Sequence, residues 1–145
     1  MFYSRKNDTI SVPLEMIPWS DKTSPVHFLS THDIDMVRWF LEGKEVEEVF
    51  ARSHKQVLRK KGKDTEDSIQ ASVEFAGGEI ATFESSWIYP DTYPTTCESR
   101  MEIVGSNGVI HIDRNSENIE SCSENNFSYP STSLSGEIDG RLEGI

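Results

Sequence analysis

Residues 30–41 read STHDIDMVRWFL, which is the clearest helical pattern in the chain. The apolar side chains of this stretch recur at the spacing of one helix face: Ile34, Val37 and Leu41, widened by Met36 and Phe40. Gly43 follows as a natural helix stop. A helix with one apolar face must lie against another apolar surface, and we expect that surface to be one face of a β-sheet.

The start of this helix contains His32, the strongest catalytic candidate in the sequence. Ser30 to Asp33 resembles a capping box, which places His32 in the first turn. The positive end of the helix dipole disfavours imidazolium there, and a neutral imidazole can take a proton from a hydroxyl and return it. Asp35 shares this helix face and could hold one ring nitrogen, unless it pairs with Arg38. The alternative is that His32 is only a polar residue near a helix start.

Residues 69–75 alternate polar and apolar side chains with period two, and Gly77-Gly78 then predicts a hairpin turn. A two-residue turn pairs Phe75 with Ile80 and leaves apolar groups on both faces, so that such a sheet needs covering on both sides. A three-residue loop instead gathers the apolar residues on one face: Ile69, Ala71, Val73, Ala81, Phe83 and Trp87. Paired glycines favour the two-residue turn.

Further strands are predicted by their content of β-forming residues: residues 8–12, stopped by Pro13, residues 46–57, and a second hairpin of residues 101–104 and 109–112 around the turn 105–108. Residues 18–25 read as an ordered loop because of their prolines and serines. Residues 115–145 have little periodicity, and we expect this tail to be partly frayed. The chain, residues 1–145, therefore predicts one α+β domain, a largely antiparallel open sheet with the helix packed on one face.

Composition and charge exclude several classes of function. The 145-residue chain has a net charge of −11, which repels a phosphate backbone, so no nucleic-acid partner is expected. No apolar run approaches the roughly 20 residues that span a bilayer, and the first residues lack a secretory signal, so we expect no membrane contact and a cytoplasmic location. The histidines and aspartates of residues 27–35 lack the spacing of a metal site, and no Gly-x-Gly-x-x-Gly motif offers a nucleotide site.

A set of motifs follows the helix in a fixed order. They are HDIDMVRWFL at 32–41, VEEVFA at 46–51, residues 67–75 with the Gly77-Gly78 turn, ESSW at 84–87, and EIVGSNGVI at 102–110. In this order, over about residues 10–113, the chain resembles the C-terminal domain of the glucose-fructose oxidoreductase and inositol dehydrogenase family, often called Gfo/Idh/MocA. The helix motif is the most specific of them, and the order of the others supports it.

The resemblance implies the C-terminal half of an NAD(P)-dependent oxidoreductase that acts on a sugar, polyol or related secondary alcohol. NAD or NADP would be bound mainly by an N-terminal Rossmann domain that this chain lacks, so the chain alone is expected to be inactive. The same resemblance matches His32 to the family's active-site histidine, which works with a lysine of the Rossmann half. It also implies a homo-oligomer, such as a dimer, formed through the open sheet.

One position departs from the family pattern. Many family dehydrogenases carry an aspartate four residues before this histidine, and here that residue is Phe28. We therefore expect a substrate site with an apolar wall, in which Trp19, His27, Phe28 and Asp35 contact the substrate. Core packing is the alternative role of the two aromatic residues. A non-catalytic ligand-binding or oligomerisation module is the alternative function, and glycoside cleavage through transient redox chemistry is a third.

Overall fold

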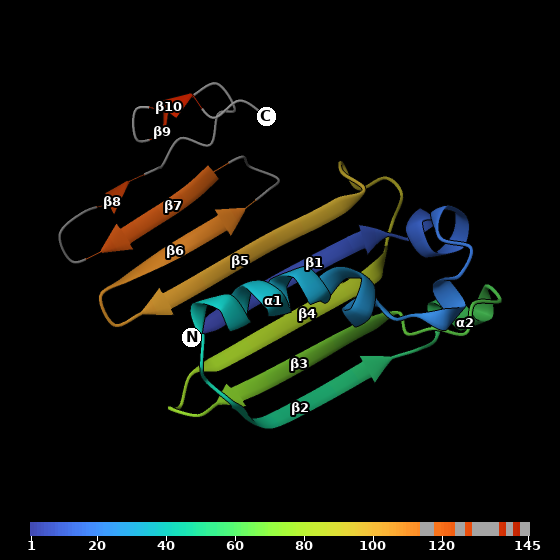
Figure 1. Ribbon diagram of the computed structural model, residues 1–145. Helices are drawn as coiled ribbons and strands as arrows, with labels where there is room; N and C mark the ends of the chain where they lie inside the picture. The colour runs from blue at the N-terminus through green and yellow to red at the C-terminus, as the bar shows by residue number, and fades with distance from the viewer. Residues whose placement is uncertain (114–117, 124–126, 129–136, 139–140, 143–145) are drawn as a thin grey trace.

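The computed structural model describes residues 1–113, 118–123, 127–128, 137–138 and 141–142. Helix α1 (Thr31–Phe40) lies across one face of an open β-sheet (Figure 1). The short helix α2 (Val57–Lys60) follows strand β2 (Val46–His54) in the chain. Three single turns of other helical types connect β1 to α1: the wide, π-type turns Val12–Met16 and Val26–Ser30, and the 3-10 turn Ser20–Lys22. The predicted α+β class, with a helix on one face of the sheet, is confirmed.

The main sheet has the strand order β2-β3-β4-β1-β5-β6-β7-β8. Its strands are β1 (Phe2–Thr9), β2 (Val46–His54), β3 (Ser68–Phe75), β4 (Ile80–Tyr89), β5 (Cys97–Gly105), β6 (Gly108–Asp113), β7 (Asn118–Ser123) and β8 (Phe127–Ser128). A separate pair is formed by β9 (Glu137–Ile138) and β10 (Arg141–Leu142). Among the described strands only β1 and β4 run parallel, so the sheet is mixed but largely antiparallel, as predicted.

β1 lies in the centre of the sheet, between β4 and β5. The prediction of a strand at residues 8–12 is wrong, because β1 ends at Thr9 and the chain then turns at Val12–Met16. Pro13 is the second residue of that turn, a position where the missing proline N–H costs no hydrogen bond. The polar side chains of residues 4–8 obscured the strand in the sequence, because a central strand is usually apolar.

The favoured register of the first hairpin is also wrong. Val73 lies opposite Ala81, whereas the two-residue turn would have paired Phe75 with Ile80. The structure has the alternative pairing, in which the apolar side chains of β3 and β4 share the face that α1 covers. The prediction that apolar side chains lie on both faces of the hairpin is therefore wrong. Nothing in this pairing requires the second face to be covered.

The loop of this hairpin contains three residues, 76–78. The Phe75 N–H donates to the Glu79 carbonyl at 2.9 Å and closes the loop. Gly77 and Gly78 both have positive φ, +117° and +83°, a region that side chains other than hydrogen disfavour. The two glycines are therefore required by a three-residue loop as much as by a shorter turn, which is why their presence did not distinguish the two.

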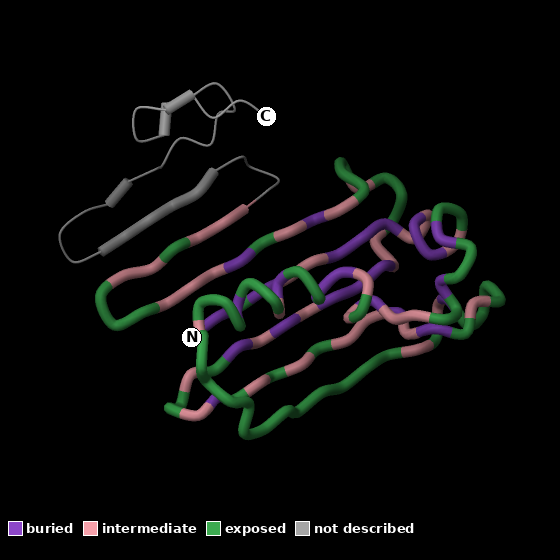
Figure 2. The backbone as a smooth tube through the Cα atoms, in the orientation of Figure 1, coloured by how far each residue is buried: buried purple, intermediate pink, exposed green. Residues whose placement is uncertain are grey.

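The core lies between α1 and the central strands. Its buried apolar residues are Phe2, Val37, Phe75, Ala81, Phe83 and Met101, and Ile34 and Leu41 pack against them. The predicted face of Ile34, Val37 and Leu41 is thus confirmed. Met36 and Phe40 do not extend it, since they remain 38% and 47% exposed at its margins. Figure 2 shows burial concentrated in β1, β4 and part of β5, with β2 exposed throughout.

The second hairpin is confirmed as predicted, with Gly105 opposite Gly108 and only Ser106 and Asn107 between them. In the predicted tail, residues 118–123 extend the sheet as β7 next to β6. The remaining described pieces of the tail are β8, β9 and β10, and the other residues of 115–145 lie outside the described part of the chain. No helix among the described residues has the length and apolar character that crossing a membrane requires.

A buried carboxylate fixes the connection between β2 and β3. The Asp67 side chain has no exposed surface, and the backbone N–H groups of residues 56–58 donate to it at 2.6–2.8 Å. The His54 ring lies 3.1 Å from the same carboxylate. Burial by itself raises the pKa of Asp67, but the N–H groups of Leu58, Val57 and Gln56 and the His54 ring outweigh it and hold that pKa below its ordinary value. Asp67 therefore caps α2 as an ionised group.

Candidate active site

His32 lines a pocket of about 460 Å³ at the end of β1. Five elements meet there: α1 supplies His32, β1 supplies Lys6 and Asp8, the turns Val12–Met16 and Val26–Ser30 supply Val12 and Phe28, and β5 supplies Cys97. Pockets of this size are typical of small-molecule sites. We call it the His32 pocket, and its polar members are a histidine, an amine, a carboxyl group, a thiol and the threonine Thr96.

Asp33 attaches α1 to β1 and so fixes the position of its neighbour His32. Ser4 Oγ donates to Asp33 Oδ2 at 2.7 Å, and Lys6 Nζ donates to Oδ1 at 3.0 Å. Asp33 is 5% exposed, so this is a largely buried ion pair with an additional hydrogen bond. An ammonium has three donors, which leaves Lys6 able to contact a ligand in the pocket as well.

The predicted capping box is wrong. Ser30 makes no side-chain capping hydrogen bond, because the preceding residues from Val26 already form a helical turn that runs into α1. The first free N–H groups, and with them the positive end of the helix dipole, therefore lie near Pro25 and not at His32. Wide turns of this type, within or next to helices, are frequent at functional sites.

Asp8 is the carboxyl group of the pocket, and it is 4% exposed. Burial raises the pKa of Asp8 above its ordinary value, although a hydrogen bond from the Cys97 thiol and the charge of Lys6 act in the opposite direction. Asp8 and Cys97 are direct partners across β1 and β5. A carboxyl group with a raised pKa that lines a pocket has the properties of a candidate acid, base or hydrogen-bonding group.

Phe28 gives the pocket an apolar wall. Its ring centroid lies 6.1 Å from that of Trp19 and 6.1 Å from that of Trp87, which is fully buried and donates its indole N–H to the Glu66 carbonyl at 2.6 Å. Phe28 therefore belongs both to an aromatic cluster and to the pocket. Trp19 is 50% exposed and contacts Phe28 without lining the pocket itself.

The other two predicted substrate contacts lie outside the His32 pocket. His27 lines a separate groove of about 740 Å³ between α1 and strands β2 and β3, and its Nδ1 is 2.9 Å from Ser24 Oγ. Asp35 is exposed, and within the described residues no hydrogen bond joins it to His32. The structure thus brings together His32 and Phe28 of the five predicted site residues.

The model of the GFO/IDH/MocA C-terminal domain matches residues 13–111. The chain belongs to the GFO/IDH/MocA family. A search of curated protein sequences gives no match.

Solved structures share the fold at low sequence identity. An inositol dehydrogenase homologue from Azotobacter vinelandii, complexed with NADH and myo-inositol, superposes with a TM-score of 0.70 at 15% identity, covering 99% of this chain and 38% of that one. UDP-N-acetylglucosamine 3-dehydrogenase from Acidithiobacillus ferrooxidans gives 0.70 at 16%, covering 96% and 39%. Levoglucosan dehydrogenase in complex with NADH gives 0.67 at 18%, covering 90% and 38%. This GFO/IDH/MocA chain therefore spans less than two fifths of the length of these relatives.

Four polar members of the pocket in this GFO/IDH/MocA domain were missed in the sequence: Lys6, Asp8, Thr96 and Cys97. Lys6 and Asp8 are two residues apart on a strand, so both project to the face that α1 covers. This alternation was the only local signal that the two side chains share a face. It could be used only if residues 2–9 were recognised as a strand. Cys97 had no such signal, because its position opposite Asp8 depends on a pairing between strands 89 residues apart.

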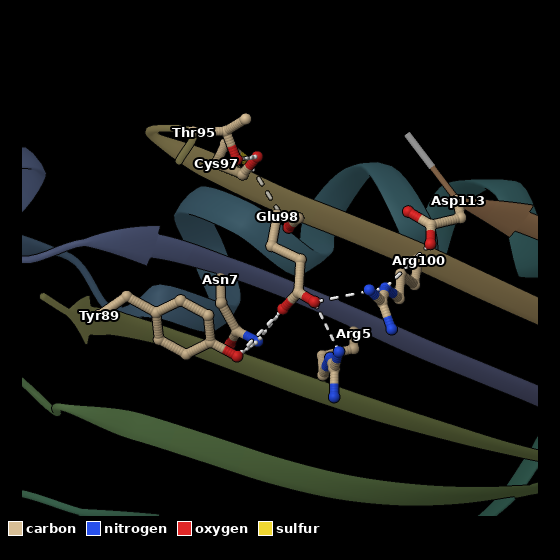
Figure 3. Close-up of polar contacts among 8 residues, drawn as sticks. All are labelled: Arg5, Asn7, Tyr89, Thr95, Cys97, Glu98, Arg100 and Asp113. Carbon is tan, nitrogen blue, oxygen red and sulfur yellow. Dashed lines mark hydrogen bonds and ion pairs between the residues drawn. The ribbon is translucent and has the colours of Figure 1, made fainter. Parts of the chain in front are cut away.

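A second polar cluster lies on the face of β1 that points away from α1. Figure 3 shows the Glu98 carboxylate between Arg5, Asn7, Tyr89 and Arg100. Glu98 is 2% exposed; burial by itself raises its pKa, but hydrogen bonds from Asn7, Arg5 and Tyr89 outweigh it and hold that pKa below its ordinary value. The cluster joins β1, β4 and β5 and does not contact His32, so we assign it to the stability of the sheet.

Proposed function

We propose that the intact protein is an NAD- or NADP-dependent oxidoreductase that acts on a secondary alcohol of a sugar or related compound. In this proposal the domain forms one wall of the substrate site. The observation that carries it is the His32 pocket, in which an imidazole, an ammonium and a buried carboxyl group meet beside an aromatic wall. The family supports the reaction class, and the neighbours that bind myo-inositol or NADH support the classes of substrate and cofactor.

Three polar members, His32, Lys6 and Asp8, have distinct proposed roles. His32 takes the proton from the hydroxyl that is oxidised, because a neutral imidazole is a suitable base near neutral pH. Lys6, held by Asp33, donates a hydrogen bond to a second hydroxyl. Asp8 supplies the carboxyl group that Phe28 cannot supply, from a different strand. Phe28 packs against the apolar C–H face of the sugar ring.

The nicotinamide supplies the acceptor for the hydride when it is bound. We propose that the part of the protein outside this chain holds the nucleotide, since this chain spans 38% of the nicotinamide-binding neighbours and contains no glycine-rich nucleotide loop. The role of this chain is then to bind and orient the alcohol and to remove its proton.

The test is a survey of inositols and monosaccharides with the full-length protein and either NAD or NADP, followed by the absorbance of the reduced nicotinamide. We expect turnover with at least one of them and none with the 145-residue chain alone. Calorimetry should also detect no tight binding of NAD to the isolated chain. Turnover or tight NAD binding by the chain alone would contradict the proposal that the nucleotide is bound outside this chain.

Substituting Asp8 tests its role in the same assay. We expect Asp8→Asn to raise KM more than it lowers kcat, because the amide keeps one acceptor but loses the charge. In the native protein kcat/KM should fall as the pH drops through the pKa of Asp8, which burial places above the ordinary value of about 3.9. The amide side chain of the variant cannot titrate, so the contribution of Asp8 to the acidic limb should disappear, while the fall caused by protonation of the general base stays. Asp21→Asn, at an exposed aspartate outside the pocket, is the matched control.

A non-catalytic ligand-binding or oligomerisation module is the second candidate, and Phe28 in place of an aspartate favours it. In that case loss of the His32 side chain leaves any measured activity unchanged. The cytoplasmic location stays a prediction, and so does association through the sheet.

A further inference from the structure

The Asp8 carboxyl group has no charged partner in the His32 pocket. Asp8 is 4% exposed, and its one hydrogen bond with a described side chain comes from the Cys97 thiol, which is a weak donor. No ion pair joins Asp8 to a lysine, arginine or histidine of the described part of the chain. Because a buried carboxylate without a counter-charge is costly, a cationic group of a ligand would stabilise it.

Lys6 does not supply that counter-charge. Lys6 and Asp8 are two residues apart on β1, so their Cα atoms are about 6–7 Å apart along the strand. The Lys6 ammonium lies 3.0 Å from Asp33 Oδ1 in α1, and the Lys6 side chain is 15% exposed. Burial raises the pKa of Asp8 more than the charge of Lys6 lowers it. Lys6 is therefore paired with Asp33, and Asp8 is left without a cation.

This pairing leaves the pocket with an excess negative charge. Asp8 and Asp33 are two carboxylates, Lys6 is one ammonium, and His32 is neutral in its proposed role as a base, so one negative charge is left over. The other polar members of the pocket, a threonine and a thiol, are uncharged. A sugar hydroxyl can donate a hydrogen bond to Asp8 but leaves this charge in place, whereas a protonated amine donates and also cancels it.

The apolar wall of the pocket favours the same kind of ligand. Phe28 lines the pocket together with Asp8, and the face of an aromatic ring attracts a cation. A carboxylate and an aromatic ring in one pocket can therefore both contribute to binding an alkylammonium group. The whole chain carries a net charge of −11, so its field also favours the approach of a cation over that of an anion.

We propose that the substrate carries a protonated amine, as an amino sugar or an aminocyclitol does, and that Asp8 binds this ammonium group. This substrate class belongs to the same pocket and therefore rests on the function proposed above. The three N–H donors of the ammonium allow it to bind Asp8 and a second acceptor, such as the Thr96 hydroxyl. The reaction is unchanged: the alcohol carbon gives a hydride to the nicotinamide, the hydroxyl gives its proton to His32, and the amine stays protonated.

The test compares ligands that differ only in the replacement of one hydroxyl by an amine. Glucose is paired with its 2-, 3- and 6-amino-deoxy derivatives, and myo-inositol with an aminodeoxyinositol, so that the position of the amine is varied. Calorimetry measures the binding of each ligand to the full-length protein saturated with reduced nicotinamide cofactor, which cannot accept a hydride. We expect at least one amine to bind about ten- to a hundredfold more tightly than its parent alcohol, the range for a hydrogen bond to a charged group.

Substituting Asp8 tests the origin of this preference. Asp8→Asn should lower the affinity for the amine at least tenfold more than the affinity for its parent alcohol, because the amide has the shape of the carboxylate without its charge. Asp21→Asn, which removes an exposed negative charge outside the pocket, should keep the preference. A parent alcohol that binds as tightly as every amine would overturn the amine assignment, and this comparison on the native protein needs no variant to fold. A preference that survives Asp8→Asn would overturn the role of Asp8.

Turnover of the same ligands separates these outcomes from failure of the proposed reaction. Neutral sugars that are oxidised as efficiently as every amine would overturn the substrate class and leave the reaction intact. Tight binding of an amine without oxidation of any ligand would instead support the ammonium site and contradict the reaction.

Discussion

Replacing His32 with alanine in the full-length protein should lower kcat by about 10²- to 10⁴-fold, the range expected when a general base is removed. KM should change little, because the other polar members of the pocket, Lys6 and Asp8, remain to bind the substrate. The measurement is steady-state turnover of the best substrate from the survey. His32→Gln, which keeps a hydrogen-bonding side chain but cannot act as a base near neutral pH, should be nearly as impaired.

His111→Ala is the matched control for this substitution. The His111 ring lies on β6, with Nε2 2.8 Å from a Glu102 carboxylate oxygen, and it does not line the His32 pocket. Its loss should leave kcat within about twofold, as expected for a half-exposed side chain away from the chemistry. Equal turnover in the native protein and His32→Ala would remove the catalytic role and favour the non-catalytic module.

Asp67→Ala should lower the free energy of unfolding by about 3–4 kcal/mol, because three backbone N–H groups lose a charged acceptor in a buried position. Asp64→Ala is the control. Its carboxylate is 82% exposed and pairs with Lys55 at 3.1 Å, an arrangement worth well under about 1 kcal/mol. Urea unfolding followed by tryptophan fluorescence compares the two, with Trp87 buried next to the affected loop.

The same carboxylate predicts how stability depends on pH. The hydrogen bonds at Asp67 hold its folded-state pKa below the unfolded value of about 3.9. The stability that it contributes is therefore complete above that value and is lost as the pH falls through the folded-state pKa. Asp67→Asn should be less stable at neutral pH, and the difference from the native protein should shrink on acidification. If the free energies of unfolding of the native protein and Asp67→Asn differ by the same amount at every pH down to acid unfolding, the charge of Asp67 does not contribute to stability.

The sequence allowed the helix and the second hairpin to be predicted because their patterns are local. Ile34, Val37 and Leu41 recur within one helix, and the turn at Ser106-Asn107 joins strands that are adjacent in the chain. The first hairpin shows the limit of this reasoning. Paired glycines fit two loop lengths, and the choice between them depends on which face α1 covers, which is not a local property.

The candidate site shows the same division between local and distant information. His32 was found because it belongs to a specific motif on a recognisable helix. Asp8 was missed because it lies on a polar central strand, and its pocket depends on the packing of α1 and on the pairing of β1 with β5. The positive end of the helix dipole was wrongly predicted at His32 for a related reason, since the helical turn before Ser30 has no sequence signature distinct from a loop.

The central position of β1 has a consequence for how the chain folds. Phe2 pairs with Ala81 on one side and with Ile103 on the other, so β1 pairs with strands that lie about 80 and about 100 residues later in the chain. A high average separation between contacting residues slows folding, because the chain must close long loops before those contacts form. The β2-β3-β4 meander can assemble first from neighbouring segments, and the insertion of β1 beside it, closed by β5, is the step at which we expect the rate to be set. Until β1 inserts, the β2-β3-β4 meander would have an unpaired edge at β4, to which a chaperone could bind. Lys6 and Asp8 lie on β1, so the His32 pocket would form only in this last step.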